Sequence, residues 1–323
     1  MTKPTIYISR KIPEYLVKPY EEQFHFKMWP EETTPIPKDV LYEEVKKVDG
    51  LICLITEKID RPFLEHASHL KIIANMAVGY DNIDVEAAKQ QNIIITNTPD
   101  VLTETTADLT FALLMATARR LIEASNIIYE NRWKQWSPFW LAGTDVHHKT
   151  IGIVGMGRIG EAVARRAKGF NMEIIYHNRN RKKAAEKELG AIYVSFDELL
   201  ERADFVVSLL PLTKETANKF DREAFKRMKS SAIFINASRG GVVDEEALYE
   251  ALKTNEIKAA GLDVFKNEPI SSDHPFTTLP NVVLLPHIGS ATVATREKML
   301  KLCLENVSLV FQGKEPKTPV YPD

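Results

Sequence analysis

The chain has 323 residues and a formal net charge of −2 at pH 7, with 27% charged and 44% hydrophobic residues. This length suits two domains better than a single core, and the composition is typical of globular proteins. The near-neutral charge predicts no affinity for nucleic acid or for an anionic membrane surface. Because no apolar run resembles a signal-peptide core or a membrane span, we expect a cytoplasmic protein.

Strands and helices alternate through the first hundred residues. Short runs rich in Ile and Val predict four strands, at Thr5–Ser9, Leu51–Ile55, Lys71–Met76 and Asn92–Asn97. Helical stretches such as Lys38–Val48 and Asp84–Gln91 lie between them. Alternation at this spacing predicts an α/β fold with a parallel sheet covered on both faces.

A second alternating series begins at Thr150. Its predicted strands are Thr150–Val154, Met172–His177, Ala191–Val194, Phe205–Leu209, Ala232–Asn236, Ala259–Val264 and Val282–Leu285. The two series therefore predict two parallel sheets, one for each domain.

The segment between the two series contains a domain boundary. Asn97 to Asp100 includes Pro99, which disfavours helix in the residue before it. We expect one long helix from Thr105 to Asn131, and its Leu109–Ala116 part is apolar nearly all round, which is typical of a helix covered by another domain or subunit. Three tryptophans follow, Trp133, Trp136 and Trp140, either as ordinary packing or as a subunit contact near a substrate pocket.

Residues 155–160 match the pattern G-x-G-x-x-G between a predicted strand and a run with helical spacing. In that context Gly155 permits a tight turn, Gly157 lets the backbone approach a pyrophosphate, and Gly160 lets helix and strand pack closely. The phosphates would bind the N–H groups at the helix N-terminus. A purely structural glycine turn is the alternative, and the flanking pattern disfavours it.

The strand after this loop ends without the acidic residue that usually binds the ribose 2′-hydroxyl of NAD. Asn178 is found there instead, followed by Arg179 and Arg181. Guanidinium groups bind a 2′-phosphate, so the sequence favours NADP(H), with NAD(H) as a second cofactor. The alternative is a solvated basic helix start.

Three polar side chains follow strands of the second series. Arg239 and His287 follow strands closely, and Glu268 lies in the loop beyond one. Taken singly, each has an ordinary structural explanation: Arg239 a surface salt bridge, Glu268 a loop carboxylate, and His287 a histidine with satisfied hydrogen bonds. Because ligands of open parallel sheets bind beyond the carboxyl ends of the strands, their convergence on one edge predicts a catalytic site. The two cysteines, Cys53 and Cys303, lie in apolar stretches and are expected to be reduced and buried, and no metal site is expected.

Several motifs together resemble the D-isomer-specific 2-hydroxyacid dehydrogenase family, and within it the glyoxylate/hydroxypyruvate and 2-ketogluconate reductases. The resemblance covers nearly the whole chain. Its motifs are Met76–Asp84, Thr150–Gly160, Leu210–Thr216, Asn236–Gly240 and Pro286–Ser290.

The resemblance implies a role for each site residue. Arg239 would anchor the substrate, Glu268 would orient His287, and His287 would be the acid/base. The backbone of Val78 and Gly79 would help to hold the substrate carboxylate. Besides the glycine loop and the basic segment, the expected cofactor contacts are Arg158, Ile159, Pro211, Thr216, Ala237, Asp263 and Gly289, with Asp263 on the nicotinamide carboxamide.

The family's cofactor domain is inserted into its substrate domain, and both are Rossmann-like or flavodoxin-like. The resemblance therefore implies a substrate-binding domain at 1–98 and 290–323 and a dinucleotide-binding domain at 99–289. A helix near Ala291–Gln312 would return to the first domain. The resemblance and the apolar helix both favour a homodimer.

The expected reaction is NAD(P)H-dependent reduction of a small 2-oxo acid. The cofactor supplies the hydride, and a histidine that titrates near neutral pH supplies the proton. A cofactor-sensing corepressor of the same fold is an alternative, since fold does not fix function, but the full catalytic set disfavours it. Glu268 disfavours formate dehydrogenase. An end at Asp323 without a regulatory domain disfavours the longer phosphoglycerate dehydrogenases.

Overall fold

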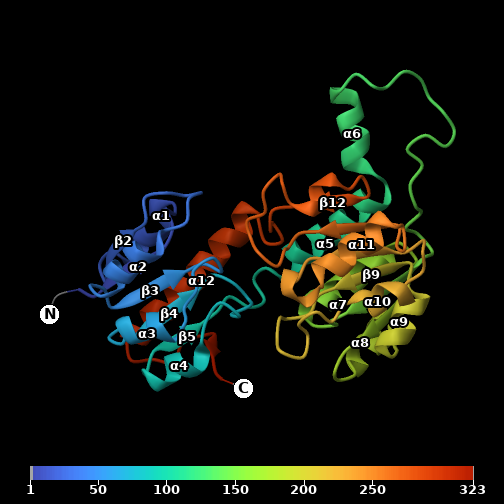
Figure 1. Ribbon diagram of the computed structural model, residues 1–323. Helices are drawn as coiled ribbons and strands as arrows, with labels where there is room; N and C mark the ends of the chain where they lie inside the picture. Colours follow the sequence, from blue (N-terminus) through green and yellow to red (C-terminus); the bar gives the residue numbers. More distant parts are fainter. Residues whose placement is uncertain (1–2, 323) are drawn as a thin grey trace. The chain divides into compact units, whose positions relative to one another are not determined.

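The structure is a computed structural model that describes residues 3–322. Met1, Thr2 and Asp323, which the expected domain bounds include, lie outside the described residues. The chain forms two compact units, and each has its own sheet (Figure 1). Unit 1 comprises the chain up to Leu102 and from Ala291 onward, and unit 2 is Thr103–Ser290. Unit 2 is therefore inserted into the sequence of unit 1.

Unit 1 is built on a six-stranded sheet of order β13-β5-β4-β3-β1-β2. The strands are β1 (Thr5–Ile8), β2 (His25–Met28), β3 (Gly50–Cys53), β4 (Ile72–Asn75), β5 (Ile94–Thr96) and β13 (Pro319–Val320). Every pair is parallel except β13 with β5. The order of β1 to β5 is flavodoxin-like, with its switch point between β1 and β3.

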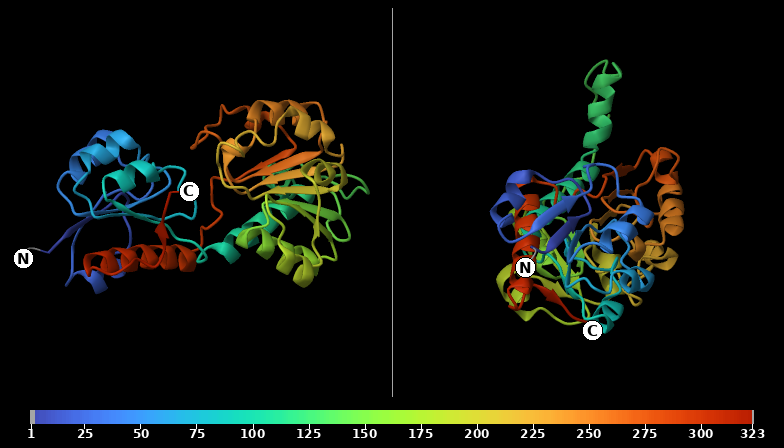
Figure 2. Two further views of the ribbon diagram at one scale, coloured as in Figure 1. Left: turned by 90° about the horizontal axis from the view of Figure 1, so that it is seen from below. Right: turned by 90° about the vertical axis from the view of Figure 1, so that its left-hand side faces the viewer.

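The helices of unit 1 include the one that returns from the end of the chain. They are α1 (Glu14–Val17), α2 (Lys38–Val45), α3 (Arg61–His66), α4 (Val85–Gln90) and α12 (Val293–Phe311). α12 packs against β4 and runs along the sheet of unit 1, as Figure 2 shows. Cys53 on β3 and Cys303 on α12 are both free and buried, and burial raises the pKa of the Cys303 thiol to about 12.

Unit 2 is built on a seven-stranded sheet of order β12-β11-β10-β9-β6-β7-β8, in which every pair is parallel. The strands are β6 (Thr150–Val154), β7 (Glu173–His177), β8 (Ile192–Tyr193), β9 (Phe205–Ser208), β10 (Ile233–Asn236), β11 (Ala259–Leu262) and β12 (Val282–Leu284). This is the doubly wound order of a dinucleotide-binding fold, with its switch point between β6 and β9. The expected fold class is confirmed.

Helices cover both faces of this sheet. They are α5 (Thr103–Ala118), α7 (Arg158–Gly169), α8 (Lys183–Leu189), α9 (Phe196–Arg202), α10 (Arg222–Arg227) and α11 (Glu245–Lys253). Ile233 and Ile235 belong to the core shared with α5 and α7, whereas Phe234 belongs to the core shared with α9, α10 and α11. Successive strand side chains alternate in direction, so one apolar run supplies both cores.

The expected single helix from Thr105 to Asn131 is wrong. α5 ends at Ala118, and a second helix, α6, covers Leu121–Tyr129. Arg120 between them is left-handed, with φ 53°, and this interrupts the helical course without a Gly or Pro in the sequence to mark the break. α6 and the loop after it project from the rest of unit 2 (Figure 1).

Two strands escaped the sequence reading. β2 lies at the edge of its sheet, and its residues are half-buried or exposed, so it lacks an apolar run. β13 has two residues and pairs only with β5. Short edge strands of this kind carry little hydrophobic signal. Within residues 3–322, no helix is both long enough and apolar enough to cross a membrane.

The packing of Phe234 makes a stability prediction. Its ring lies 4.8 Å from that of Phe220 and 5.6 Å from that of Phe225, and its side chain is 0% exposed. Phe234→Ala should therefore lower the free energy of unfolding by about 3–5 kcal/mol, measured by chemical denaturation. Val293→Ala, at a side chain 77% exposed, should change it by less than about 0.5 kcal/mol. Equal effects of the two substitutions would contradict this account of the core.

Candidate active site

The carboxyl ends of the unit 2 strands form one aligned edge. In the register, Val154 of β6 pairs with Ser208 of β9, which pairs with Asn236 of β10, which pairs with Leu262 of β11. The residues that follow these strand ends, including Gly155, Ala237 and Asp263, are therefore neighbours along that edge. Most residues that the sequence predicted for the site lie there.

The glycine loop has the geometry that a dinucleotide site requires. Gly155 has φ 106°, and a Cβ there would lie 2.7 Å from the Leu209 backbone, so only glycine fits. A Cβ on Gly160 would lie 2.4 Å from the Gly155 carbonyl oxygen. By contrast, a Cβ on Gly157 would meet nothing within 4 Å, which leaves open space before the first turn of α7. This loop and helix N-terminus fit a pyrophosphate.

Asn178 forms two hydrogen bonds to the backbone of the glycine loop, a role that the sequence did not indicate. Its Oδ1 accepts from Met156 N at 2.7 Å, and its Nδ2 donates to the Met156 carbonyl oxygen at 3.2 Å. An aspartate could replace only the first of these hydrogen bonds, because a carboxylate cannot donate. The residue after β7 therefore shapes the loop as well as lying at the expected ribose position.

The two arginines of the basic segment differ in their partners. Arg181 donates two hydrogen bonds to Glu186, at 3.0 and 2.7 Å, and its guanidinium lies over the Tyr193 ring. The hydrogen bonds that Glu186 receives from Arg181 and Tyr176 lower its pKa to about 2. Arg179 is exposed and faces the negative charge of Glu215. Of the two, Arg179 is the less tightly engaged.

Arg239 stands on a loop that buried polar groups hold together. Asn236, at the end of β10, is buried, and its Nδ2 donates to the Arg239 carbonyl oxygen at 3.0 Å. Its Oδ1 accepts from both Ser238 N and Ser238 Oγ. Ser238 Oγ in turn lies 3.2 Å from Ser208 Oγ on the neighbouring strand end. The guanidinium of Arg239 is therefore presented by a fixed backbone.

Glu268 and His287 form a close polar pair in the site. His287 Nδ1 lies 2.7 Å from Glu268 Oε2, and Glu268 Oε1 accepts from Phe265 N at 2.9 Å. Both side chains are about three-tenths exposed. Burial acts to raise the pKa of Glu268, but the hydrogen bond and charge of His287, with help from Phe265 N and Arg239, outweigh it and lower that pKa. Glu268 is therefore held as a carboxylate beside the ring.

Asp263 fixes the backbone that carries His287. Its carbonyl oxygen accepts from His287 N at 2.9 Å, and its Oδ1 accepts from Ile288 N at 2.8 Å. These bonds hold His287 at φ 54°, a left-handed conformation that is uncommon for residues other than glycine. Burial raises the pKa of Asp263, against the lowering effect of the Ile288 N–H and the His287 charge.

The remaining predicted cofactor residues lie near the same edge of unit 2. Pro211 and Thr216 follow β9, and Thr216 Oγ1 donates to the Pro211 carbonyl oxygen at 2.6 Å. Ala237 follows β10. Gly289 lies beside Asp263, since a Cβ built on this glycine would be 3.3 Å from Asp263 Oδ2. Arg158 and Ile159 begin α7.

Val78 and Gly79 lie in unit 1, in the loop after β4. Asn97 Nδ2 donates to the Val78 carbonyl oxygen at 2.8 Å, and Asn75 Nδ2 donates to that of Gly79 at 3.0 Å. Among residues 3–322, neither Val78 nor Gly79 gives its own N–H to a protein acceptor. Sequence reasoning missed the two asparagines, whose only signal is their position at the ends of β4 and β5.

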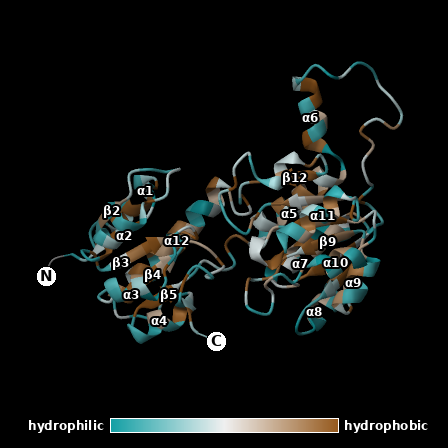
Figure 3. Cartoon of the chain, in the orientation of Figure 1, coloured by the Kyte–Doolittle hydropathy of each residue, from teal (hydrophilic) through white to brown (hydrophobic). Residues whose placement is uncertain are grey.

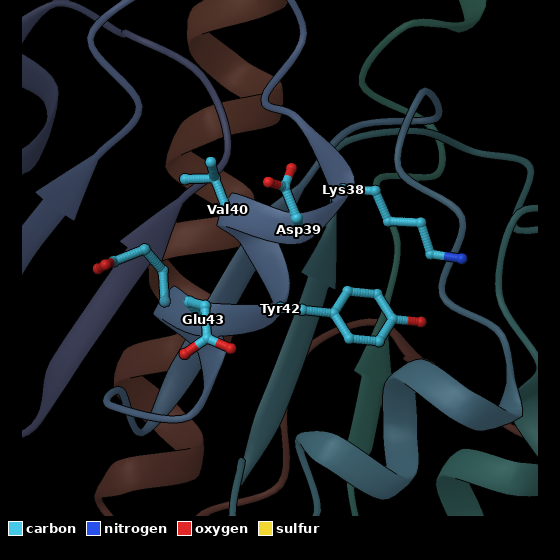
Figure 4. Close-up of a pocket in the computed structure, with 6 residues that line it drawn as sticks. Lys38, Asp39, Val40, Tyr42 and Glu43 are labelled. Atoms are coloured by element: carbon cyan, nitrogen blue, oxygen red, sulfur yellow. The ribbon is translucent and has the colours of Figure 1, made fainter.

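A surface hollow of about 720 Å³ lies over α2 in unit 1 and contains no predicted site residue. Lys38 and Tyr42 project to one side of the helix, whereas Val40 and Glu43 project to the other (Figure 4). These side chains do not converge on a common point, so the hollow does not have the form of a ligand site.

The sequence model of the "D-isomer specific 2-hydroxyacid dehydrogenase, NAD binding domain" matches residues 111–289. The chain is 50% identical to the glyoxylate reductase of Pyrococcus furiosus over 322 residues, which cover 98% of this chain and 95% of that protein. It is also 50% identical to the glyoxylate reductase of Thermococcus kodakarensis, over 98% of this chain and 96% of that protein.

Solved structures agree with the sequence relatives. A protein from Thermus thermophilus superposes with a TM-score of 0.92 at 42% identity, covering 98% of this chain and 99% of that one. The NADPH-dependent glyoxylate/hydroxypyruvate reductase of Sinorhizobium meliloti, in complex with NADP and malonate, superposes with a TM-score of 0.86 at 34% identity, covering 99% and 97%. With its doubly wound cofactor fold and these relatives along its whole length, the chain belongs to the D-isomer-specific 2-hydroxyacid dehydrogenase family.

Proposed function

We propose that this protein reduces glyoxylate, hydroxypyruvate or 2-ketogluconate to the D-2-hydroxy acid, with NADPH as its preferred cofactor. The observation that carries the proposal is the 2.7 Å contact between His287 and Glu268, on the sheet edge that also carries Arg239 and the glycine loop. An acid/base pair, a guanidinium and a dinucleotide loop on one edge are what reduction of a 2-oxo acid needs. The names of the relatives point to the same substrate class.

Each side chain has a distinct task in this proposal. The nicotinamide cofactor, when bound, supplies the hydride that adds to C2 of the substrate. Glu268 holds Nδ1 of His287, so the proton for the developing alkoxide comes from Nε2. Arg239 binds the substrate carboxylate and stabilises negative charge on the carbonyl oxygen. The role that the family resemblance implies for the backbone of Val78 and Gly79 in unit 1 stays a prediction.

A spectrophotometric panel tests this function directly. Glyoxylate, hydroxypyruvate, 2-ketogluconate and pyruvate would each be tested with NADPH and NADH, and formate with the oxidised cofactors. Turnover of at least one 2-oxo acid is expected, and formate should be inert. Cofactor binding without turnover of any substrate would favour a corepressor-like sensor instead. The cytoplasmic location stays a prediction, which cell fractionation would test.

The acid/base role predicts a large loss of turnover in His287→Ala. Removing a positioned proton donor should lower kcat by about 10²–10⁴, measured under saturating substrate. The dissociation constant of the cofactor should change little, because the glycine loop lies on other strands. Turnover close to that of the wild type would show that His287 is not the acid.

The planar fork of Arg239 predicts that charge alone is insufficient. Arg239→Lys keeps the positive charge but loses the bidentate geometry, so both KM and kcat for the 2-oxo acid should deteriorate. Steady-state kinetics with the best substrate of the panel measure both constants. A kinetically silent lysine variant would remove this role.

The cofactor preference rests on Arg179. Because Glu186 already engages Arg181, we expect Arg179 to be the main contact of the 2′-phosphate. One hydrogen bond to a charged group contributes roughly 1.5–3 kcal/mol, so kcat/KM should favour NADPH by at least about tenfold at low salt. Arg179→Ala should weaken NADPH binding and leave NADH nearly unchanged, and Arg181→Ala should have a smaller effect. Equal efficiency of the wild type with both cofactors would contradict the assignment.

Asn178→Asp tests how the ribose position is coupled to the glycine loop. From the sequence alone, this change combined with Arg179→Ala should reverse the cofactor preference. The contact with Met156 adds a cost, because the new carboxylate would face the carbonyl oxygen to which Nδ2 donates. We therefore expect the double variant to prefer NADH but to bind it more weakly than the wild type does.

A homodimer is the assembly that the projecting part of unit 2 favours. α6 and the loop after it expose large apolar side chains, of which Trp136 is 79% and Phe139 87% exposed. The hydrophobic residues of α6 appear as brown segments in Figure 3. Patches of this kind mark interfaces, and aromatic residues are enriched there. We propose that a second copy of the chain covers this surface.

Two substitutions and one control substitution test the dimer and the position of Trp140. Ile128→Asp on α6 should shift the chain toward monomer, measured by analytical ultracentrifugation. Val293→Asp, which also replaces an exposed apolar residue but lies on α12, should not. Trp140→Ala should alter kcat/KM between 2-oxo acids more than between cofactors, if the loop reaches a substrate pocket. A monomeric wild type, or a Trp140 variant with unchanged preferences, would contradict the respective part.

A further inference from the structure

The loop that carries Glu268 is exposed, so its position needs an explanation. Lys266, Asn267, Glu268 and Pro269 are all exposed, and the buried stretch before them ends at Phe265. The hydrogen bond from Phe265 N to Glu268 Oε1 is local to the loop and does not fix the loop on the domain. An exposed loop without outside anchors would let the carboxylate drift from His287.

Glu245 supplies such an anchor. Its Oε1 accepts from Lys266 N at 2.7 Å, one residue after the amide that holds Glu268. Glu245 is the first residue of α11, whose N-cap Asp244 accepts from Ala247 N. The Glu245 side chain is only 21% exposed and extends from a packed helix. The loop is therefore tied to a rigid element through its own backbone.

Gly240 brings the Arg239 loop against the same backbone. A Cβ on Gly240 would lie 1.8 Å from Phe265 C and 2.2 Å from Lys266 N, so the two loops are in backbone contact. Any residue larger than glycine would push Phe265 and Lys266 away. The loop of Arg239 thus supports one side of the Glu268 loop, and the Glu245 carboxylate holds its N–H.

His274 lies beside the Glu245 carboxylate. His274 Nδ1 accepts from Phe276 N at 3.4 Å, so Nε2 is the protonated nitrogen of the neutral ring. Nε2 lies 3.9 Å from Glu245 Oε2, and the ring packs edge-on against Phe265 at 5.9 Å. Oε1 of Glu245 therefore accepts from the Glu268 loop, and Oε2 lies on the side of the His274 ring.

We propose that Glu245 is a positioning residue for Glu268, and through it for the proton transfer of His287. This inference rests on the proposed reductase function. Glu245 touches neither substrate nor cofactor in this assignment. It holds Lys266 N, which sets the direction of the backbone from Phe265 to Glu268. Loss of that hydrogen bond lets the carboxylate leave the 2.7 Å contact with Nδ1.

The test compares two neighbouring glutamates in the first turn of α11. Glu245→Ala is expected to lower kcat for the best 2-oxo acid about 10- to 100-fold, since a misplacement of about 1 Å has effects of this size. KM for that acid should change far less, because the hydrogen bonds of Asn236 keep Arg239 in place. The cofactor dissociation constant should be unchanged. Glu246→Ala, which makes the same charge change at an exposed position, should be close to wild type.

Two further variants separate position from charge. Glu245→Gln keeps an acceptor oxygen at the same distance and should retain most of the turnover. Glu245→Asp keeps the charge and favours the helix start but is one methylene too short to reach Lys266 N, so it should be defective. These two variants also serve if the alanine protein does not fold.

The outcomes separate this inference from the function on which it rests. Normal kcat in Glu245→Ala or Glu245→Asp, in an active wild-type background, would overturn the positioning role alone. Equal defects in the Glu245 and Glu246 variants would assign the effect to the charge of the helix start and would also overturn it. A wild type that reduces no 2-oxo acid would remove the proposed function, and the positioning role with it.

Discussion

The hydrogen bond between His287 Nδ1 and Glu268 Oε2 joins two loops that leave different strands, and the other features of the site serve to hold those loops in place. Glu268 Oε1 accepts a hydrogen bond from Phe265 N. Asp263 accepts hydrogen bonds from His287 N on its carbonyl oxygen and from Ile288 N on its Oδ1. The Glu268 loop is also anchored on α11, because Lys266 N donates to Glu245 Oε1, so both loops are held by hydrogen bonds between backbone amides and carboxylates. The backbone hydrogen bonds to Asp263 also hold His287 in its left-handed conformation, at φ 54°.

Two carboxylates beside this histidine have opposite environments. Asp263 is buried, and burial raises its pKa. Glu268 is partly exposed and closer to the ring, and the contact with His287 lowers its pKa despite the burial. The difference follows from geometry, since Asp263 mainly receives backbone N–H groups whereas Glu268 directly contacts a group that can carry charge. One carboxylate therefore supports the backbone, and the other supports the ring.

The loops that carry Arg239 and Val78 share a way of being built. In each, an asparagine at a strand end donates to a carbonyl oxygen of the loop, Asn236 to Arg239 and Asn75 to Gly79. Asn236 and Asn75 are buried, so their amides have little access to water. Loss of their hydrogen bonds would leave buried polar groups unpaired, which is energetically unfavourable. In each unit, a side-chain amide thus fixes the backbone of a loop that follows a strand end.

The sequence by itself determined the alternation of strands and helices, the glycine loop and the residues that follow the strand ends. These features depend on local patterns: apolar runs, glycine spacing and the position of polar residues after strands. The family and the fold class were also evident from those motifs, and the comparisons and the structure confirm them. The edge strand β2 and the break at Arg120 were missed because neither a hydrophobic run nor a Gly or Pro marks them.

Only the tertiary structure decided which polar groups meet. Residue spacing in the sequence could not predict three of the hydrogen-bonded pairs: Asn178 with Met156, Glu186 with Arg181, and Glu245 with Lys266 N. The last pair lies 21 residues apart, on a helix and a loop from different strands. Such contacts depend on the register of seven parallel strands and on backbone approaches such as that of Gly240 to Phe265, and these are set by the packing of the whole sheet.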